Sequence, residues 1–250
     1  IDRYRGGFGG GGNWAKARRY YLTQDPDLKK LNSPLLADLG EVNMADGATL
    51  VDFAVWAIQS YPARHVALIL SDHGLGWPGG FSDMDSGGNG PHDLALAEMF
   101  GDSLWLMELD DALTEIRRRT GRAQLDLIGL DACLMGTIEV YATLAPHARY
   151  VVASEEVEPD LGWAYASFLM QLAFDPEMDA AALAQAIVDS YIFKDEVITD
   201  DDTRQEFIAE NLTVKRASAE DVARLMSADT TLSAVESAAL PNLLRALDDF

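Results

Sequence analysis

Two short aliphatic runs have the pattern of strands buried on both faces. Residues 65–72 and 125–136 are rich in Leu, Ile, Val and Ala, and neither run alternates apolar with polar positions. Runs of this type are typical of a parallel sheet that is covered by helices. The first run ends in Ser71-Asp72 and is followed by His73-Gly74. The second contains Asp131-Ala132-Cys133. Polar groups therefore follow two candidate neighbouring strands.

Most of the remaining chain is predicted to alternate between strands and helices. The further expected strands are residues 17–23, 150–154 and 231–235. The expected helices are residues 49–60, 105–120, 135–144, 178–192, 218–228 and a last one that starts at Pro241. Residues 32–47 and 74–92 are expected to be loops, and residues 194–216 show no periodic pattern. This order predicts an α/β protein with a mostly parallel sheet flanked by helices.

The composition is that of a globular protein large enough for a substantial core. The chain has 250 residues, of which 48% are hydrophobic and 24% charged. We expect a single domain over residues 1–250, truncated at both ends, with residues 1–14 as a flexible Gly-rich segment and the protein a monomer. A single cysteine excludes an internal disulfide. No apolar run approaches the ~18 residues of a membrane span, and no signal peptide is recognised.

The charge balance is strongly acidic. A formal net charge of -22 argues against nucleic acid and against a polybasic membrane contact, because both need a basic surface. It favours cationic partners through long-range attraction, and the alternative is that it only keeps the protein soluble.

Cys133 and His73 are the candidate nucleophile and base. The carboxyl ends of parallel strands meet at one edge of a sheet, so these side chains are expected in one crevice. We also expect Cys133 to precede the helix at 135–144, whose positive end favours a thiolate. The alternatives are a cysteine that packs as a small hydrophobe and a histidine with a structural role. The other histidines, His65, His92 and His147, are expected at the surface.

Gly74 is a candidate for binding the oxyanion of an acyl-transfer reaction. Such chemistry needs backbone N–H groups directed at the developing negative charge, and a residue without a side chain lets the backbone approach. The N–H groups of Gly74 and Cys133 are the candidate pair. The alternative is an ordinary glycine turn after a strand.

Several motifs together resemble the clostripain family of cysteine peptidases. The matching segments are Ser-Asp-His-Gly-Leu-Gly-Trp (71–77), Gly-Leu-Asp-Ala-Cys-Leu-Met-Gly (129–136), Glu139 with Tyr141, Val-Ala-Ser-Glu-Glu (152–156), Glu-Pro-Asp-Leu-Gly-Trp (158–163), Leu-Gly-Glu-Val-Asn-Met (39–44) and Thr-Leu-Ser-Ala-Val-Glu (231–236). The resemblance implies a caspase-like three-layer α/β fold. It also implies a dyad in which His73 is the general base and acid, and Cys133 is the nucleophile.

The resemblance further implies cleavage after Arg or Lys. Asp131 matches the family position that helps to form the acidic S1 pocket, and a guanidinium needs such a carboxylate for bidentate pairing. Asp160 is a second candidate. The alternatives are a helix cap for Asp131 and a solvated loop acid for Asp160. Ser71 stands where the family often has Trp, and Asp160 where it often has Gly, which leaves the shape of the pocket open.

Processing, metal binding and localisation are also implied by the family. Some relatives are activated by self-cleavage at a basic residue after the histidine, but no Lys or Arg lies between His73 and Arg117, so we expect this region to stay uncut. No cofactor is expected, apart from irregular calcium binding by the acids that begin at Asp83. An EF-hand is excluded because its fifth and twelfth positions would be Gly87 and Leu94. Family resemblance suggests a secreted or cell-envelope protein.

Two other functions compete with a peptidase. Metal-dependent sulfatases and phosphatases also place Asp and His after a strand, but they need a Cys/Ser-x-Pro-x-Arg setting, and Leu-Met-Gly follows Cys133. A non-catalytic caspase-like module that binds peptides or a partner would be free to lose Cys133 or His73, and both are present. Thiol alkylation distinguishes a peptidase from a metal-dependent hydrolase, which would respond to chelators instead.

Overall fold

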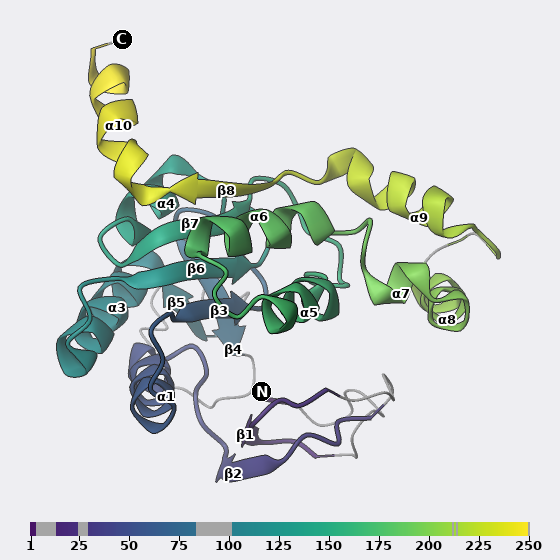
Figure 1. The fold of residues 1–250 in the computed structure, drawn as a ribbon, viewed down its shortest axis with the longest axis horizontal. Coiled ribbons are helices and arrows are strands. Elements are labelled where there is room, and N and C mark those ends of the chain that lie inside the picture. The colour runs from purple at the N-terminus through teal and green to yellow at the C-terminus, as the bar shows by residue number, and fades with distance from the viewer. Residues whose placement is uncertain (4–13, 25–29, 84–101, 212, 214, 250) are drawn as a thin grey trace. The chain divides into compact units, whose positions relative to one another are not determined.

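The computed structural model describes residues 1–3, 14–24, 30–83, 102–211, 213 and 215–249 (Figure 1). The chain divides into two compact units. The first contains Ile1–Leu50 and Ser82–Leu104, and the second contains Val51–Phe81 and Trp105–Phe250. His92 and most of the Gly-rich N-terminal segment lie outside the described residues.

A four-stranded sheet forms the centre of the second unit. Its strands are β3 (Ala67–Ser71), β6 (Leu125–Asp131), β7 (Ala148–Ser154) and β8 (Leu232–Glu236), in the order β3-β6-β7-β8. β3, β6 and β7 are parallel, whereas β8 runs antiparallel to β7. The predicted mostly parallel sheet is therefore confirmed.

Helices cover both faces of this sheet, which explains the uninterrupted apolar sequence of β6. Leu127 faces a core that includes Phe168 of α5 (Tyr165–Phe174) and Ile187 of α6 (Ala180–Ser190). Figure 1 shows α6 in front of β6 and β7, with α3 (Leu106–Thr120) and α4 (Ile138–Leu144) behind the sheet. Because successive side chains of a strand point to opposite faces, Ile128 and Leu130 are buried on the other side.

α3 ends where its sequence predicts. Arg117, Arg118 and Arg119 occupy the last turn, and Gly121 adopts a left-handed φ of 70° while its N–H donates to the Arg117 carbonyl. Cations at this end suit the helix dipole, and glycine enters the left-handed region without steric cost. α3 contains no helix breaker before Gly121, so its boundary could be read from local signals alone.

Two helices form in the segment that has no periodic pattern. They are α7 (Glu196–Thr199) and α8 (Asp201–Asn211). α8 is rich in charged residues, and its buried side chains include Arg204 and Ile208. An anchor made partly of an arginine leaves no apolar stripe in the sequence, so the expected 3.6-residue period is missing. The chain then continues into α9 (Ala219–Met226), the 3₁₀ turns η1 (Ser227–Asp229) and η2 (Ser237–Ala239), and α10 (Leu240–Asp248).

The loop predicted for residues 32–47 is wrong in part. Residues Leu35–Gly40 form β2, which pairs antiparallel with β1 (Ala17–Tyr20) in the first unit. β2 is mainly exposed, so it carries no inward-facing apolar pattern to reveal it. α1 (Gly47–Ser60) follows, close to the predicted helix.

The loop predicted for residues 74–92 is also wrong in part. Gly79–Asp83 form β4, which pairs with β5 (Asp102–Trp105) in a two-stranded sheet. Gly79 and Gly80 are turn signals in a sequence, and backbone pairing with a distant strand outweighs them here. Residues 74–78 belong to no named strand or helix, in agreement with the prediction, and residues 84–92 lie outside the described residues.

His147 is buried rather than exposed, so that prediction is wrong. Its side chain is 2% exposed, and Nε2 lies 2.6 Å from a carboxylate oxygen of Asp110 on α3. Nδ1 lies 3.4 Å from Nη1 of Arg117, also on α3. The histidine therefore joins the α4–β7 connection to α3 by polar contacts on both ring nitrogens.

None of the helices in the described part of the chain is long and apolar enough to cross a bilayer.

Candidate functional site

The ends of β3 and β6 bring the His73 and Cys133 segments together. Ser71 is the register partner of Asp131, and the Asp72 N–H donates to the Asp131 carbonyl at 3.3 Å. His73 and Cys133 each lie two residues beyond these paired positions. A Cβ atom added to Gly74 would overlap the Cys133 carbonyl oxygen, so the two backbones are in direct contact there. His73 is exposed and Cys133 is partly exposed, so both reach the surface.

The chain after His73 doubles back as a tight antiparallel pair. The Phe81 N–H donates to the His73 carbonyl at 2.7 Å, and the Leu75 N–H donates to the Gly79 carbonyl at 2.9 Å. Gly74 lies opposite Gly80 between these two bonds. Because hydrogen bonding alternates sides along an antiparallel strand, the N–H of Gly74 points away from Gly80 and is not used by this pair.

The loop after β7 holds the segment that contains Cys133. The Leu134 N–H donates to the Glu156 carbonyl at 3.1 Å, and the Gly136 N–H donates to the Ser154 carbonyl at 2.6 Å. Leu134 has a φ of 64°, in the left-handed region that a leucine seldom occupies. Strain of this kind persists where surrounding bonds enforce it, and it fixes the turn directly after the cysteine.

The helix expected directly after Cys133 begins later than predicted. α4 starts at Ile138 after an N-cap at Thr137, so the thiol does not lie at a helix N-terminus and that prediction is wrong. Instead, the backbone N–H of Glu158 lies 3.3 Å from Sγ and donates to it. The Glu158 carbonyl oxygen also lies 3.8 Å from Sγ, where it can accept the S–H.

Asp131 is a buried carboxylate at the end of β6. It is 5% exposed and accepts hydrogen bonds from the Tyr165 hydroxyl at 2.7 Å and the Ser71 hydroxyl at 3.1 Å. It does not cap α4, whose N-cap is Thr137, so the helix-cap alternative is wrong. Ser71, which stands where the family often has a tryptophan, contributes one of the two donors.

Glu158 is a second buried acid beside Asp131, and the sequence alone did not identify it as a site residue. Glu158 is only 6% exposed. The Trp163 indole N–H donates to both of its carboxylate oxygens at 3.2 Å. Burial, and then the negative charge of Asp131, raise the pKa of Glu158 to about 9.

Two tyrosines border this acid pair. Burial and the charge of Asp131 raise the pKa of Tyr165 above its ordinary value. The pKa of Tyr191, which follows α6, is raised by burial and then by the charge of Glu158. Within the described residues, the buried Tyr191 hydroxyl has no hydrogen-bond partner.

Asp160 has a different environment from Asp131. It lies in the same loop as Glu158 but is exposed, and it makes no hydrogen bond or ion pair with the residues that the structure describes. Its proposed contact with substrate stays a prediction. Glu155 and Glu156 are also exposed, and their backbone N–H groups donate to the Thr231 hydroxyl, which is a structural role.

One acidic cluster lies in the first unit. Asp2, Glu41 and Asp83 each bring a carboxylate oxygen within 4.8 Å of the others. Asp83 is the described member of the segment that we considered for calcium, and one of its oxygens accepts the Met44 N–H at 2.8 Å. Exposed acidic groups often approach one another without an ion, so calcium binding stays a prediction.

Comparison with protein-family models gives one match that covers most of the chain. The Clostripain family model, Peptidase_C11, matches residues 22–247. The chain belongs to the clostripain family. Clostripain from Hathewaya histolytica is 30% identical over 144 residues, an alignment that covers 50% of this chain and 24% of that protein.

Solved structures of the family have the same fold. A secreted C11 cysteine protease from Bacteroides thetaiotaomicron, in complex with an irreversible peptide inhibitor, matches with a TM-score of 0.58 and 20% identity, covering 94% of this chain and 56% of that one. An inactive zymogen C11 protease from Parabacteroides distasonis matches with a TM-score of 0.53 and 19% identity, covering 90% and 49%. These matches confirm the caspase-like α/β fold of this clostripain-family chain. The chain spans about half the length of these solved relatives and a quarter of the curated one.

Proposed function

We propose that this chain is the proteolytic part of a cysteine endopeptidase that cleaves after Arg or Lys. The observation that carries the proposal is the contact between two strand-end loops, one with an exposed imidazole and one with a partly exposed thiol, beside a buried carboxylate. Membership of the clostripain family supports this reaction class.

The proposed reaction is acyl transfer through a thioester. The Cys133 thiolate attacks the carbonyl carbon of the scissile bond, and the N–H groups of Gly74 and Cys133 bind the oxyanion. His73 gives its proton to the leaving amine as the C–N bond breaks. A water molecule then gives a proton to His73 and attacks the thioester, which releases the acid product and the thiolate.

The proposed specificity depends on Asp131. Its carboxylate has two fixed hydroxyl donors, so its orientation is set before substrate arrives. A buried carboxylate pairs strongly with a cation that replaces the lost hydration, and a guanidinium makes two parallel hydrogen bonds to it. The acidic net charge of -22 would attract basic peptides. As in the Bacteroides relative, which is described as secreted, we propose a secreted or cell-envelope location, and we propose a monomer.

The test is hydrolysis of reporter peptides that end in Arg, Lys or Asp before the leaving group. Wild type should release the reporter after Arg and Lys but not after Asp, and Cys133→Ala and His73→Ala should abolish release. Alkylation of Cys133 should remove activity. A chelator should not block the reaction at the thiol, because no step of it uses a metal. Failure of the folded full-length protein to cleave any of the peptides would overturn the proposal.

The same experiment tests the two competing functions. Peptide binding without cleavage by wild type, equal to binding by Cys133→Ala, would support a non-catalytic module. Activity on sulfate or phosphate esters that is lost with chelators and insensitive to alkylation would support a metal-dependent hydrolase.

A further inference from the structure

Glu158 contacts the nucleophile through its main chain. Its backbone N–H donates to Cys133 Sγ at 3.3 Å, and its carbonyl oxygen lies 3.8 Å from the same sulfur, where it can accept the S–H. The peptide groups on both sides of Glu158 therefore contact Sγ. A shift of this residue would change the direction in which the sulfur is held.

The side chain of Glu158 is held by an indole. The Trp163 N–H donates to both carboxyl oxygens at 3.2 Å, and both residues are buried. Burying a carboxyl group costs free energy, and a hydrogen bond to a donor offsets part of that cost. No step of the proposed reaction uses this carboxyl group, so its burial beside the nucleophile needs another explanation.

The Trp163 ring lies on the backbone of the central sheet. A Cβ atom added to Gly129 of β6 would lie 2.8 Å from Cζ3 of the ring, so the indole packs directly against that strand. Gly129 is the register partner of Ile69 on β3 and of Val152 on β7. The indole is therefore supported at a point where the sheet has a paired strand on each side.

The same loop reaches the proposed specificity acid. Gly162, directly before Trp163, lies so close to Asp131 that an added Cβ atom would be 3.1 Å from Oδ2. The Gly162 N–H donates to the Pro159 carbonyl at 3.1 Å, which closes this part of the loop as a turn. One short segment, residues 158–163, therefore contacts the nucleophile at one end and the proposed substrate-binding carboxylate at the other.

Resting on the function proposed above, we propose that Glu158 and Trp163 are positioning residues, whose side-chain hydrogen bond fixes Cys133 Sγ for attack on the scissile carbonyl. We call this hydrogen bond, between the Trp163 indole and the Glu158 carboxyl group, the indole clamp. It ties the loop to the rigid sheet, and the Glu158 main chain then holds the sulfur. A misplacement of about 1 Å at a reacting group lowers a rate by up to about 100-fold, so this support is expected to act on kcat.

The first test measures kcat and KM for an Arg amide reporter. Trp163→Phe keeps a ring against Gly129 but removes the donor, and Glu158→Ala removes the acceptor. Each variant should lower kcat by about tenfold or more and keep KM within about twofold of wild type, because the placement of the nucleophile changes and the binding of the Arg side chain does not. Glu158→Gln should keep the wild-type kcat, since its amide oxygen accepts the same N–H.

A double variant shows whether the two side chains act as one unit. Trp163→Phe combined with Glu158→Ala should have the kcat of either single variant, since each change alone already breaks the indole clamp. Trp56→Phe on α1 and Glu155→Ala, an exposed glutamate of the same loop, are the matched controls and should leave kcat unchanged. Additive losses, an equal loss in Glu158→Gln and Glu158→Ala, or a rise in KM without a fall in kcat would overturn the proposal.

The second test needs no activity. In protein labelled with fluorotryptophan, the fluorine NMR resonance of Trp163 is the one that is missing from Trp163→Phe. Alkylation of Cys133 with iodoacetamide replaces the S–H that the Glu158 carbonyl accepts, so it should shift this resonance in wild type and in Glu158→Gln. The shift should be much smaller in Glu158→Ala, where the side chain no longer connects the loop to the indole. No shift in wild type, or an equal shift in Glu158→Ala, would overturn the proposal.

These outcomes separate the two proposals. Cleavage after Arg with the wild-type kcat in Trp163→Phe would overturn the indole clamp alone. Absence of cleavage by folded wild type would overturn the proposed function, and the fluorine resonance would still decide whether the indole and the thiol are connected. If Glu158→Ala does not fold, the kcat of Trp163→Phe compared with that of Trp56→Phe decides, and equal values count against the clamp.

Discussion

At the scale of the residue, Gly74 and Cys133 constrain each other. The Gly74 backbone lies so close to the Cys133 carbonyl that a Cβ atom could not fit without moving one of the two loops. The same position leaves the Gly74 N–H directed away from Gly80 and unused by that pair, as its proposed role requires. The absence of a side chain is therefore needed for both the contact and the proposed chemistry.

Gly74→Ala should reduce both activity and stability. The added methyl group displaces one backbone donor from the oxyanion, and the loss of one such donor lowers kcat by about 100-fold or more. Hydrolysis of an Arg reporter measures kcat, and thermal unfolding measures stability. Gly121→Ala, at a helix end with open space around it but a strained φ, is the control that affects stability alone. Equal kcat in Gly74→Ala and wild type would contradict the role of this residue.

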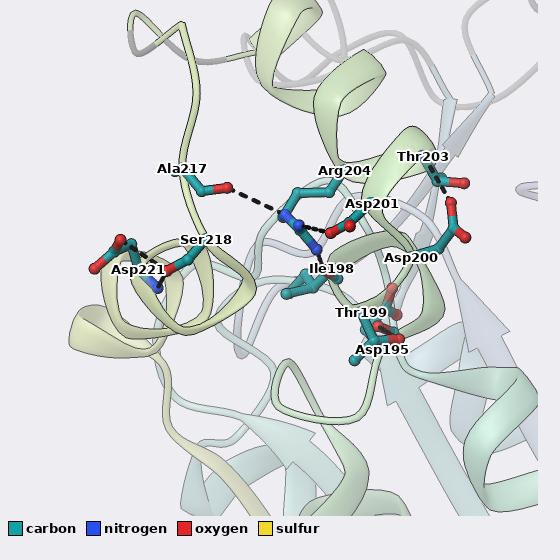
Figure 2. Close-up of polar contacts among 10 residues, drawn as sticks. All are labelled: Asp195, Ile198, Thr199, Asp200, Asp201, Thr203, Arg204, Ala217, Ser218 and Asp221. Atoms are coloured by element: carbon teal, nitrogen blue, oxygen red, sulfur yellow. Dashed lines mark hydrogen bonds and ion pairs between the residues drawn. The ribbon is translucent and has the colours of Figure 1, made fainter.

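At the scale of the element, Arg204 joins three segments that the sequence pattern does not connect. Figure 2 shows its guanidinium donating to the Ala217 carbonyl before α9, at 3.2 Å, and to the Ile198 carbonyl of α7, at 2.6 Å. It also pairs with Asp201 at the start of α8. The guanidinium thus caps α7 and fixes the approach to α9, in place of an apolar contact.

Arg204→Met should destabilise the protein although it removes a charge. The carbonyls of Ile198 and Ala217 would lose their donor inside the protein, which costs ~1–3 kcal/mol for each group that stays unpaired. Arg224→Met removes an exposed arginine that pairs with Glu220 and Asp221, and such pairs contribute less than ~1 kcal/mol. Denaturant unfolding of both variants measures the difference. Similar losses in the two would show that the Arg204 contacts do not stabilise the fold.

At the scale of the whole molecule, the buried acid pair makes stability depend on pH. The pKa of Glu158 is about 9 in the folded protein and 4.5 as its ordinary value. Between these values the unfolded chain has released the proton while the native state still holds it. The native state then binds more protons, so this group lowers the free energy of unfolding as the pH rises from about 4.5 to about 9.

Glu158→Gln should therefore gain stability over wild type across that window. The difference in free energy of unfolding should grow by up to ~1.4 kcal/mol per pH unit and level off outside the window. Denaturant unfolding at several pH values measures it, with Glu155→Gln as the flat control. A difference that does not change with pH would mean that Glu158 is ionised in the native protein.

The net charge of -22 acts on the whole molecule through the solvent. Attraction of a basic substrate over distances beyond contact is screened by salt, because the Debye length falls to about 3 Å at about 1 M ionic strength. The value of kcat/KM for an Arg peptide with several further lysines should fall several-fold between about 0.02 M and about 0.5 M salt. A neutral peptide with one Arg should change much less, and equal changes would exclude steering by the acidic surface.

The sequence by itself determined the ends of the central strands and the residues that follow them. The aliphatic runs of β3 and β6 are local signals, and so are Gly121 at the end of α3 and the single cysteine. Parallel strands bring their carboxyl ends to one edge, so the approach of the His73 and Cys133 segments followed from topology.

Only the tertiary structure decided which acids are buried and what contacts the thiol. Asp131, Glu158 and Asp160 are all carboxylic acids, yet the first two are buried and the third is exposed. Glu158 contacts Cys133 although the two lie 25 positions apart, and His147 is buried because Asp110 and Arg117 of α3 contact it. Burial and pKa depend on the sum of contacts from distant segments, and no local pattern of residues contains that sum.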